Sequence, residues 1–205
     1  ERYRADAIVI TGDLVNNERA DEYRVLADTI RDVATPIYLM PGNHDDYAHL
    51  RSAFPDHKYL PSEGAISYAI DSYPVRIVAI DQVASGETHG VFTPADADWL
   101  DATLAMAPEQ PTVVAMHHPP FRTHDLLFDR IGLLGAEGLE AVIARHPQVA
   151  RIICGHHHRI VVGQCAQAVV IVAPSSDWTY GLALDDGDHI AKRTEEQPGW
   201  ALHLW

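Results

Sequence analysis

Basic residues are scarce in this chain. Its 205 residues include 15 lysines and arginines against 29 aspartates and glutamates, so the formal net charge at pH 7 is −14. No basic stripe is present that could neutralise a phosphate backbone, which argues against a nucleic-acid polymer as partner. A surface this acidic also repels anionic membranes. A small phosphorylated substrate remains compatible, because the charge of a bound metal outweighs the distant surface.

Cysteine is nearly absent, and long apolar runs are lacking altogether. Cys154 and Cys165 do not make a disulfide framework, and this usage suits a reducing compartment, so we expect the cytoplasm. We interpret both cysteines as small buried hydrophobic residues. No apolar run approaches the length of a membrane span. The chain starts at Glu1 without Met and enters an apolar run almost at once, so we expect further sequence upstream.

The apolar pattern predicts one α/β domain over residues 1–205, with two packed sheets and helices outside them. The expected helices are Ala20–Val33, Tyr47–Phe54, Pro94–Met106 and Gly135–Arg145. The expected strands are Ala7–Thr11, Pro36–Met40, Ala65–Ile70, Val75–Ile80, Thr112–Met116, Val149–Cys154, Ile160–Cys165, Ala168–Ala173 and Trp200–Trp205. The polar stretch Asp185–Gln197 is an expected exposed loop.

Four of the expected strands end in residues that can bind a metal. The junctions are Gly12-Asp13, Gly42-Asn43-His44-Asp45, Met116-His117-His118-Pro119-Pro120 and Gly155-His156-His157-His158. In an open α/β sheet, ligands bind beyond the carboxyl ends of the strands, so four such ends can converge on one place. The sequence therefore predicts a metal site, and the number of donors favours two metals.

Two of these motifs offer oxygen ligands. The Asp13 carboxylate can bridge two cations, although Gly-Asp alone is more typical of a turn or a cap. The amide oxygen of Asn43 suits a divalent ion, and His44 can face the substrate while Asp45 or Asp46 orients its ring. The alternative for this tetrapeptide is an Asx-turn with a solvated histidine.

The other two motifs offer nitrogen ligands. Adjacent side chains on an extended chain point to opposite faces, so we expect one ligand from His117 and His118, with the other packed or supporting. In the same geometry His156 and His158 point one way and His157 the other. A mixed set of nitrogen and oxygen ligands suits Zn, Fe, Mn or Co better than Ca.

Together these blocks resemble the calcineurin-like metallophosphoesterases. That family has the ordered motifs D-x-H, G-D, G-N-H-[DE], a His after a strand, and G-H-x-H, and this chain has the last four in order. The strings LMPGNHDD, MHHPP, FDRIGLL and RIICGHHHR are similar to the branch of class III cyclic nucleotide phosphodiesterases and glycerophosphodiesterases. The resemblance extends from Ala5 to Ser176. It implies a four-layer αββα sandwich of two mixed sheets flanked by helices.

The resemblance also implies a role for each residue of the site. Asp13 would bridge two divalent or trivalent metal ions, and His158 would belong to the second metal site. His44 would be catalytic together with Asp13, stabilising the phosphorane or assisting the leaving group. His118 and His157 are not ligand positions in the family pattern. The full set of implied metal ligands is Asp13, Asn43, His117, His156 and His158.

The implied reaction is hydrolysis of a small phosphodiester, such as a 3′,5′-cyclic nucleotide or a glycerophosphodiester, by a metal-bridging hydroxide. The chain departs from the family pattern twice. No D-x-H block precedes Asp13, so the N-terminal strand that carries it is missing and the second metal site is depleted. Pro174-Ser175-Ser176-Asp177 leads to Trp178, where this branch often has a histidine; an indole can stack on a base or line an apolar wall, which favours a different substrate.

Three functions stay open on the sequence alone. The first is a metal-dependent phosphodiesterase. The second is a non-catalytic interaction scaffold with the same fold, which the lack of a D-x-H block favours. The third is a phosphomonoesterase or a protein phosphatase, which the MHHPP context disfavours. Relatives in this branch commonly oligomerise, so the resemblance also implies a homo-oligomer.

Overall fold

Strands and helices alternate along most of the chain in this computed structural model, which describes residues 4–184 and 193–205. The helices are α1 (Ala20–Ile30), α2 (Tyr47–Ala53), α3 (Pro94–Ala105), α4 (Leu126–Arg130) and α5 (Ala136–Arg145). The strands are β1 (Ile8–Thr11), β2 (Ile37–Met40), β3 (Tyr68–Ile70), β4 (Arg76–Ala79), β5 (Gly90–Val91), β6 (Thr112–Ala115), β7 (Leu133–Leu134), β8 (Val149–Cys154), β9 (Val161–Cys165) and β10 (Ala168–Val172).

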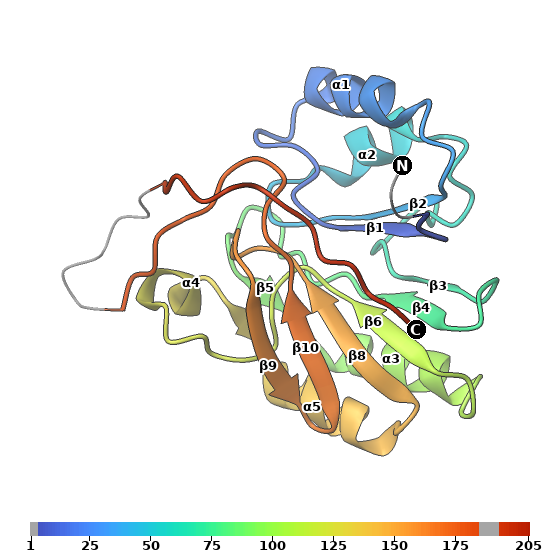
Figure 1. Cartoon of the computed structure of the whole chain (residues 1–205). Helices are drawn as coiled ribbons and strands as arrows, with labels where there is room; N and C mark the ends of the chain where they lie inside the picture. Colours follow the sequence, from blue (N-terminus) through green and yellow to red (C-terminus); the bar gives the residue numbers. More distant parts are fainter. Residues whose placement is uncertain (1–3, 185–192) are drawn as a thin grey trace.

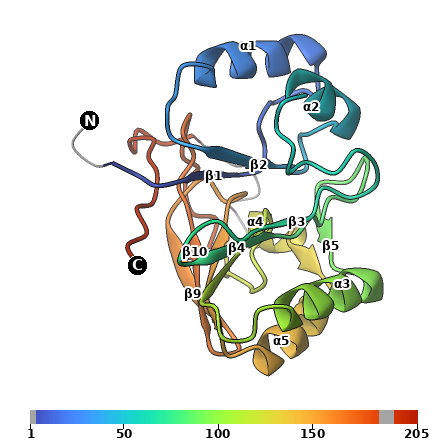
Figure 2. The ribbon, with the colours of Figure 1, turned by 90° about the vertical axis from the view of Figure 1, so that its right-hand side faces the viewer.

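These elements form four layers, as Figures 1 and 2 show from two sides. Helices α1 and α2 cover the parallel pair β1–β2, which faces a six-stranded sheet of order β3-β4-β6-β8-β10-β9. Helices α3 and α5 cover the far face of that sheet. The predicted α/β sandwich is therefore confirmed. The six-stranded sheet is mixed, with antiparallel pairs at both ends, whereas β1 and β2 run parallel.

The six-stranded sheet buries both of its faces, because its side chains alternate between two cores. Val114 and Met116 pack with α3 and α5, where Leu139 of α5 is fully buried. Ala115, which lies between them in the sequence, packs on the opposite side with Met40 of β2. This double burial explains why these strands appear in the sequence as nearly continuous apolar runs.

The carboxyl ends of four strands meet between the two sheets. Strands β6 and β8 are parallel neighbours, and the backbone N–H of Gly155 after β8 donates to the carbonyl of His117 after β6, at 3.0 Å. Strand β1 joins them through the carbonyl of Thr11, which lies 2.7 Å from Nδ1 of His117. Parallel pairing brings the end of β2 beside that of β1.

The predicted elements match the described structure closely, with one exception. The closing strand expected at Trp200–Trp205 is wrong, because this segment has no strand assignment. Its side chains instead approach Arg151 of β8, whose Nη1 lies 3.3 Å from Nδ1 of His203. The short elements α4, β5 and β7 were not predicted, since five or two residues carry too little periodic signal. The expected Asp185–Gln197 loop falls partly on residues 185–192, outside the described part of the chain.

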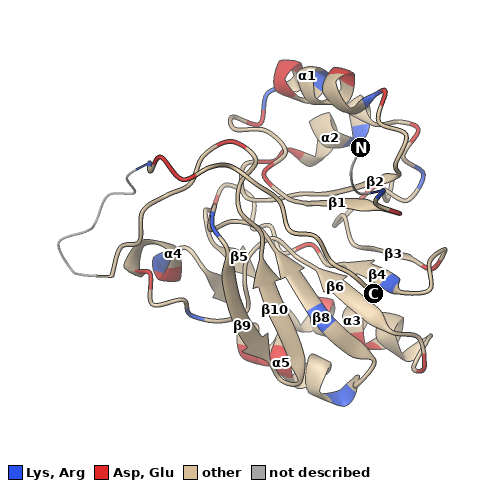
Figure 3. Ribbon diagram, in the orientation of Figure 1, with Lys and Arg blue, Asp and Glu red and all other residues tan. Residues whose placement is uncertain are grey.

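Charged side chains lie mainly on helices and loops, and the strands carry few of them (Figure 3). Both cysteines are free and buried, as expected. Within the described ranges, none of the helices is long and apolar enough to cross a bilayer.

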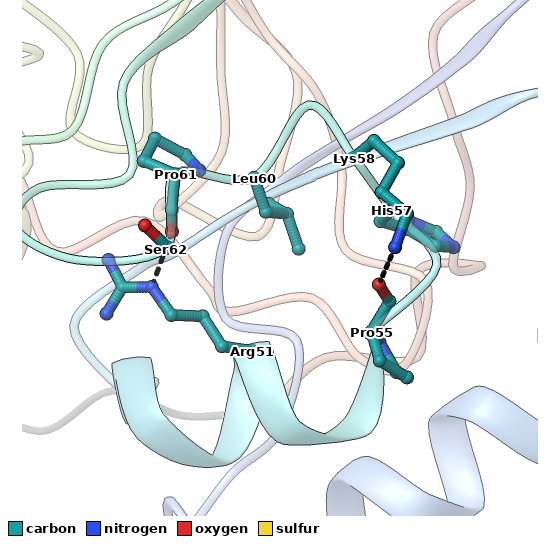
Figure 4. Close-up of a pocket in the computed structure, with 7 residues that line it drawn as sticks. All are labelled: Arg51, Pro55, His57, Lys58, Leu60, Pro61 and Ser62. Carbon is teal, nitrogen blue, oxygen red and sulfur yellow. Dashed lines mark hydrogen bonds between the residues drawn. The ribbon is translucent and has the colours of Figure 1, made fainter.

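Two surface hollows lie away from the strand ends described above. One, of about 910 Å³, is lined partly by Ile37 and Tyr38 at the start of β2, the end opposite its metal-capable junction. The other, of about 370 Å³, follows α2 (Figure 4). Its two cations are engaged by the backbone, because Nε of Arg51 donates to the Pro61 carbonyl at 2.7 Å and Nζ of Lys58 donates to a carbonyl at 2.9 Å. Neither hollow contains a predicted site residue.

We predict that Leu139→Ala lowers the free energy of unfolding by about 2–5 kcal/mol, because it leaves a cavity in the core between α5 and the sheet. Urea unfolding followed by circular dichroism measures the change. Met106→Ala is the control: its side chain is 79% exposed, and we expect a change below about 0.5 kcal/mol. Equal losses in the two variants would contradict the assignment of this core.

Candidate metal centre

Four predicted ligands form the centre of the cluster. Nε2 of His117 lies 3.4 Å from Oδ1 of Asp13 and 3.1 Å from Oδ1 of Asn43. Nδ1 of His156 lies 3.1 Å from the same Asn43 oxygen. Each of these side chains follows a different strand, so the structure brings the four predicted junctions together.

The hydrogen bonds of His117 show that the cluster fits a cation. Its Nδ1 is 2.7 Å from the Thr11 carbonyl, which can only accept, so Nδ1 carries the ring proton. In the neutral ring, Nε2 then holds a lone pair that faces the oxygens of Asp13 and Asn43. The lone pairs of this nitrogen and these oxygens repel one another unless a proton or a cation lies among them. A metal that accepts both nitrogen and oxygen ligands suits this arrangement.

Charge interactions in the cluster centre on the pair of Asp13 and His117. Burial raises the pKa of Asp13, but His117 and a hydrogen bond from the backbone N–H of His44 outweigh burial and hold this pKa well below its usual range. Burial likewise lowers the pKa of His117, and the Asp13 carboxylate outweighs it, so the His117 pKa is raised. Asp13 is therefore ionised at neutral pH, as a metal ligand must be.

His156 is buried and poorly hydrogen-bonded. Its Nε2 has no hydrogen-bond partner among the residues that the structure describes. Burial lowers the pKa of His156 well below its usual value, and the charges of neighbouring histidines lower it further. The ring is thus neutral, which is the form that binds metals.

The backbone of Gly155-His156-His157-His158 is not extended, so that prediction is wrong. His156 and His158 have φ angles of 71° and 55°, in the left-handed region. The N–H of His157 closes a turn onto the Gly155 carbonyl at 2.9 Å. The rings of His156 and His158 consequently have different partners, and Nδ1 of His158 lies 3.1 Å from the Trp178 carbonyl. Asp13 also has a positive φ of 52°, and strain of this kind clusters at functional sites.

Glycines allow the strand ends to approach this closely. A Cβ on Gly42 would lie 2.3 Å from Oδ1 of Asp13 and 2.7 Å from Cε1 of His117. A Cβ on Gly155 would lie 2.7 Å from the Thr11 carbonyl oxygen. The lack of a side chain at Gly155 therefore lets the backbones after β1 and β8 come close together.

The ring of His44 is oriented by the backbone and not by Asp45 or Asp46. Its Nδ1 lies 3.0 Å from the Asn16 carbonyl, so Nδ1 carries the ring proton. Its backbone N–H donates to Oδ1 of Asp13 at 3.0 Å. The residue is exposed, which leaves Nε2 free to meet a substrate beside the cluster.

Asp45 and Asp46 have structural roles. Asp45 is buried, and its Oδ2 accepts from the N–H groups of Leu14 and Gly42, at 3.0 and 2.8 Å. Its Oδ1 accepts from the Tyr23 hydroxyl at 2.7 Å. Asp46 caps the amino end of α2. Asp45 thus ties the junction after β1 to the junction after β2, and burial raises the pKa of this carboxyl to about 6.

Comparison with known proteins agrees with this geometry. A family model described as calcineurin-like phosphoesterase matches residues 1–159. The chain belongs to the calcineurin-like phosphoesterase family.

Two curated relatives of this calcineurin-like phosphoesterase are phosphodiesterases. A glycerophosphodiester phosphodiesterase of Enterobacter lignolyticus is 36% identical over 179 residues, which cover 85% of this chain and 64% of that protein. A 3′,5′-cyclic adenosine monophosphate phosphodiesterase of Escherichia coli K12 is 30% identical over 158 residues, which cover 77% of this chain and 56% of that protein. The chain thus spans less than two thirds of the length of either relative.

A solved structure supports the fold. The crystal structure of a dimetal phosphatase from Danio rerio superposes on this calcineurin-like phosphoesterase with a TM-score of 0.64. The match covers 84% of this chain and 73% of that one, at 17% identity. At this identity the likeness establishes the shared architecture.

His118 lies in the cluster of this calcineurin-like phosphoesterase, although the family pattern gives it no ligand role. Ligand atoms of His117, His118 and His156 all lie within 4.8 Å of one another. Nε2 of His118 lies 3.1 Å from the Thr88 carbonyl, and burial lowers its pKa to about 3. The geometry therefore offers a three-histidine set as an alternative to the predicted set with Asp13 and Asn43.

Aromatic side chains that sequence reasoning left without a role line one side of the cluster. The Phe128 ring stacks on His157 with centroids 4.4 Å apart and lies 5.4 Å from the His156 ring. The Tyr180 ring lies 4.9 Å from that of His158. Phe128 belongs to the FDRIGLL string, which was the available sequence signal for this wall. Phe128 stacks on the ring of His157, and the exclusion of His157 from the ligand set stays a prediction.

We predict that His117→Ala weakens Co²⁺ binding about ten-fold or more, because it removes the nitrogen that faces both oxygens of the cluster. Titration with Co²⁺ followed by visible absorption measures the affinity. His157→Ala is the matched control and should retain wild-type affinity, with circular dichroism confirming folding. We expect the same of His118→Ala. A loss in His118→Ala as large as that in His117→Ala would instead support the three-histidine set.

Proposed function

We propose that this protein hydrolyses small phosphodiesters with the help of two bound metal ions. The observation that carries this proposal is the Asn43 oxygen, which lies 3.1 Å from both the His117 and the His156 nitrogen, with the ionised Asp13 carboxylate beside them. The names of the two phosphodiesterase relatives support a diester as substrate. Cyclic nucleotides and glycerophosphodiesters are the substrate classes we propose.

The residues divide between two metal positions in this proposal. Asn43, His117 and His156 would hold the first ion and His158 would contribute to the second, and both ions would share Asp13 as a ligand. Two such ions, when bound, supply a nucleophile at neutral pH and stabilise the charge of an in-line displacement. The Zn, Fe, Mn or Co ions inferred from the mixed ligand set fit these donors. Nδ1 of His158 donates to the Trp178 carbonyl, so its Nε2 is left as the ligand atom.

His44 acts on the substrate in this proposal. Its backbone is fixed to Asp13 and its ring is fixed by the Asn16 carbonyl, so Nε2 is presented next to the cluster in a defined direction. When the ring is doubly protonated, Nε2 can donate a hydrogen bond to a phosphate oxygen or give its proton to the departing alkoxide, which leaves the neutral ring with its proton on Nδ1. Fixing the ring in advance reduces the entropy lost in the transition state.

We also propose the setting in which the protein acts. The chain forms one catalytic domain over residues 1–205, and a homo-oligomer is the proposed assembly. The two free, buried cysteines support a reducing compartment such as the cytoplasm. The net charge of −14 disfavours a nucleic-acid polymer or an anionic membrane as partner.

We predict that the protein with Mn²⁺, Zn²⁺ or Co²⁺ releases 4-nitrophenolate from bis(4-nitrophenyl) phosphate, and that a chelator stops the release. We expect 4-nitrophenyl phosphate, a monoester, to react more slowly. Asn43→Ala should lower the diester rate, because the amide oxygen joins two histidines of the cluster. Absence of turnover with all three metals would favour the scaffold interpretation, and faster monoester hydrolysis would make the protein a phosphomonoesterase.

We predict that His44→Ala lowers kcat about 10²-fold or more while Co²⁺ affinity stays within about two-fold of wild type, as general acid–base roles imply. Steady-state kinetics with the diester and the Co²⁺ titration measure the two effects. His49→Ala is a matched control, since His49 is also exposed and also has Nδ1 against a backbone carbonyl, that of Glu18 at 2.8 Å. A kcat for His44→Ala equal to that of His49→Ala would remove His44 from the reaction.

A further inference from the structure

Arg193 is held over the indole of Trp178. Its Cζ lies 3.8 Å from the centroid of the Trp178 ring, a cation–π contact. The backbone fixes this pair, because Tyr180 and Arg193 form an antiparallel bridge. The N–H of Thr194 also donates to the Thr179 carbonyl at 2.9 Å. The guanidinium is therefore held where two segments of the chain pair with each other, residues 177–180 and residues 193–196. We call this pair of segments the clasp.

This clasp adjoins the candidate metal centre. The Trp178 carbonyl accepts from Nδ1 of His158 at 3.1 Å, and the two rings have centroids 5.3 Å apart. Tyr180 contacts the His158 ring from the same clasp, at 4.9 Å. The Trp178 indole thus contacts both the Arg193 guanidinium and the ring of His158, a predicted metal ligand.

The stacked guanidinium changes what Trp178 can do. One face of the indole already carries Arg193, so that face cannot stack on a nucleobase. The indole N–H is buried and has no hydrogen-bond partner among the described residues, so the same side chain carries an unsatisfied donor. A guanidinium presents a planar set of donors that matches carboxylate and phosphate oxygens. The wall beside His158 therefore favours a group rich in anionic oxygen.

Three acidic residues belong to the same two segments as Trp178 and Arg193. Glu196, on the same segment, is engaged by Nη2 of Arg159 at 2.9 Å. Asp177 and Glu195 are exposed neighbours in the clasp and face solvent. Because the whole chain carries −14, its overall field disfavours any additional negative charge on a substrate. A preference for such a charge would consequently need a local cation.

We propose that Arg193, mounted on Trp178, recognises a second anionic group on the substrate, so that diesters whose alcohol substituent ends in a carboxylate or a phosphate are preferred. Arg193 is a specificity-determining residue in this proposal and takes no part in bond breaking. The inference rests on the proposed diester hydrolysis and specifies its substrate class.

The test compares two matched diesters, 4-nitrophenyl propyl phosphate and 4-nitrophenyl 2-carboxyethyl phosphate, on the metal-loaded protein. They share a leaving group and differ in one terminal carboxylate. We expect kcat/KM to be about five-fold higher for the carboxylate diester, which is the size of effect that an exposed charge pair gives. Most of this difference should come from a lower KM. In Arg193→Gln the ratio should fall to about one or below, and Arg193→Lys should restore part of it. A 2-phosphonoethyl analogue shows whether a phosphate-like group is preferred over the carboxylate.

A matched control separates local recognition from net charge. Arg24→Gln removes the same charge from an exposed position on α1, and it should keep the wild-type ratio. A ratio near one in the wild type, or a ratio that Arg193→Gln leaves unchanged, would overturn the inference. If the wild type hydrolyses neither diester, the proposed function fails, and calorimetric binding of the same pair to wild type and Arg193→Gln still decides whether Arg193 selects the anionic group.

Discussion

The hydrogen bond between Nδ1 of His117 and the Thr11 carbonyl is the contact on which the candidate site depends. At 2.7 Å it joins the end of β6 to the end of β1, and so links the two sheets. It also fixes the ring proton on Nδ1, which turns the lone pair of Nε2 toward Asp13 and Asn43. Gly12 makes this approach possible, since a Cβ there would lie 2.4 Å from the same Nδ1. Sheet packing and ligand orientation are therefore determined by one interaction.

Buried polar groups also hold the site in place, because burying such a group is energetically unfavourable unless it forms hydrogen bonds. Asp45 is ionisable and buried, which raises its pKa to about 6, but three hydrogen bonds offset part of that cost and hold the ends of β1 and β2 together. Asp13, His156 and His158 adopt left-handed backbone conformations that an isolated chain would rarely hold. Packing of the surrounding layers keeps these residues in place, so the cluster is organised before any ligand arrives.

The fold of this protein and its proposed substrate specificity arise from different parts of the chain. The four layers are those of the calcineurin-like phosphoesterase family, and Asp13, Asn43 and His117 lie within the residues that the family model matches. The wall of Trp178 and Arg193 is built by segments that follow the last strand of the sheet, outside the residues that the family model matches. A common core with a variable wall is the usual way in which one fold serves several substrates.

The sequence by itself determined most of the layers and the candidate ligands. Strands such as β6 and β8 could be predicted because burial on both faces requires continuous apolar runs, and a histidine that can bind a metal follows each strand two residues later. Only the tertiary structure decided that Asn16 orients His44, that residues 155–158 turn instead of extending, that Trp200–Trp205 forms no strand, and that Arg193 stacks on Trp178. Local sequence patterns indicate which residues are buried and whether they repeat with the period of a helix or a strand. The partner of a ring nitrogen or a guanidinium can lie far away in the chain, and packing of the whole molecule determines which groups meet.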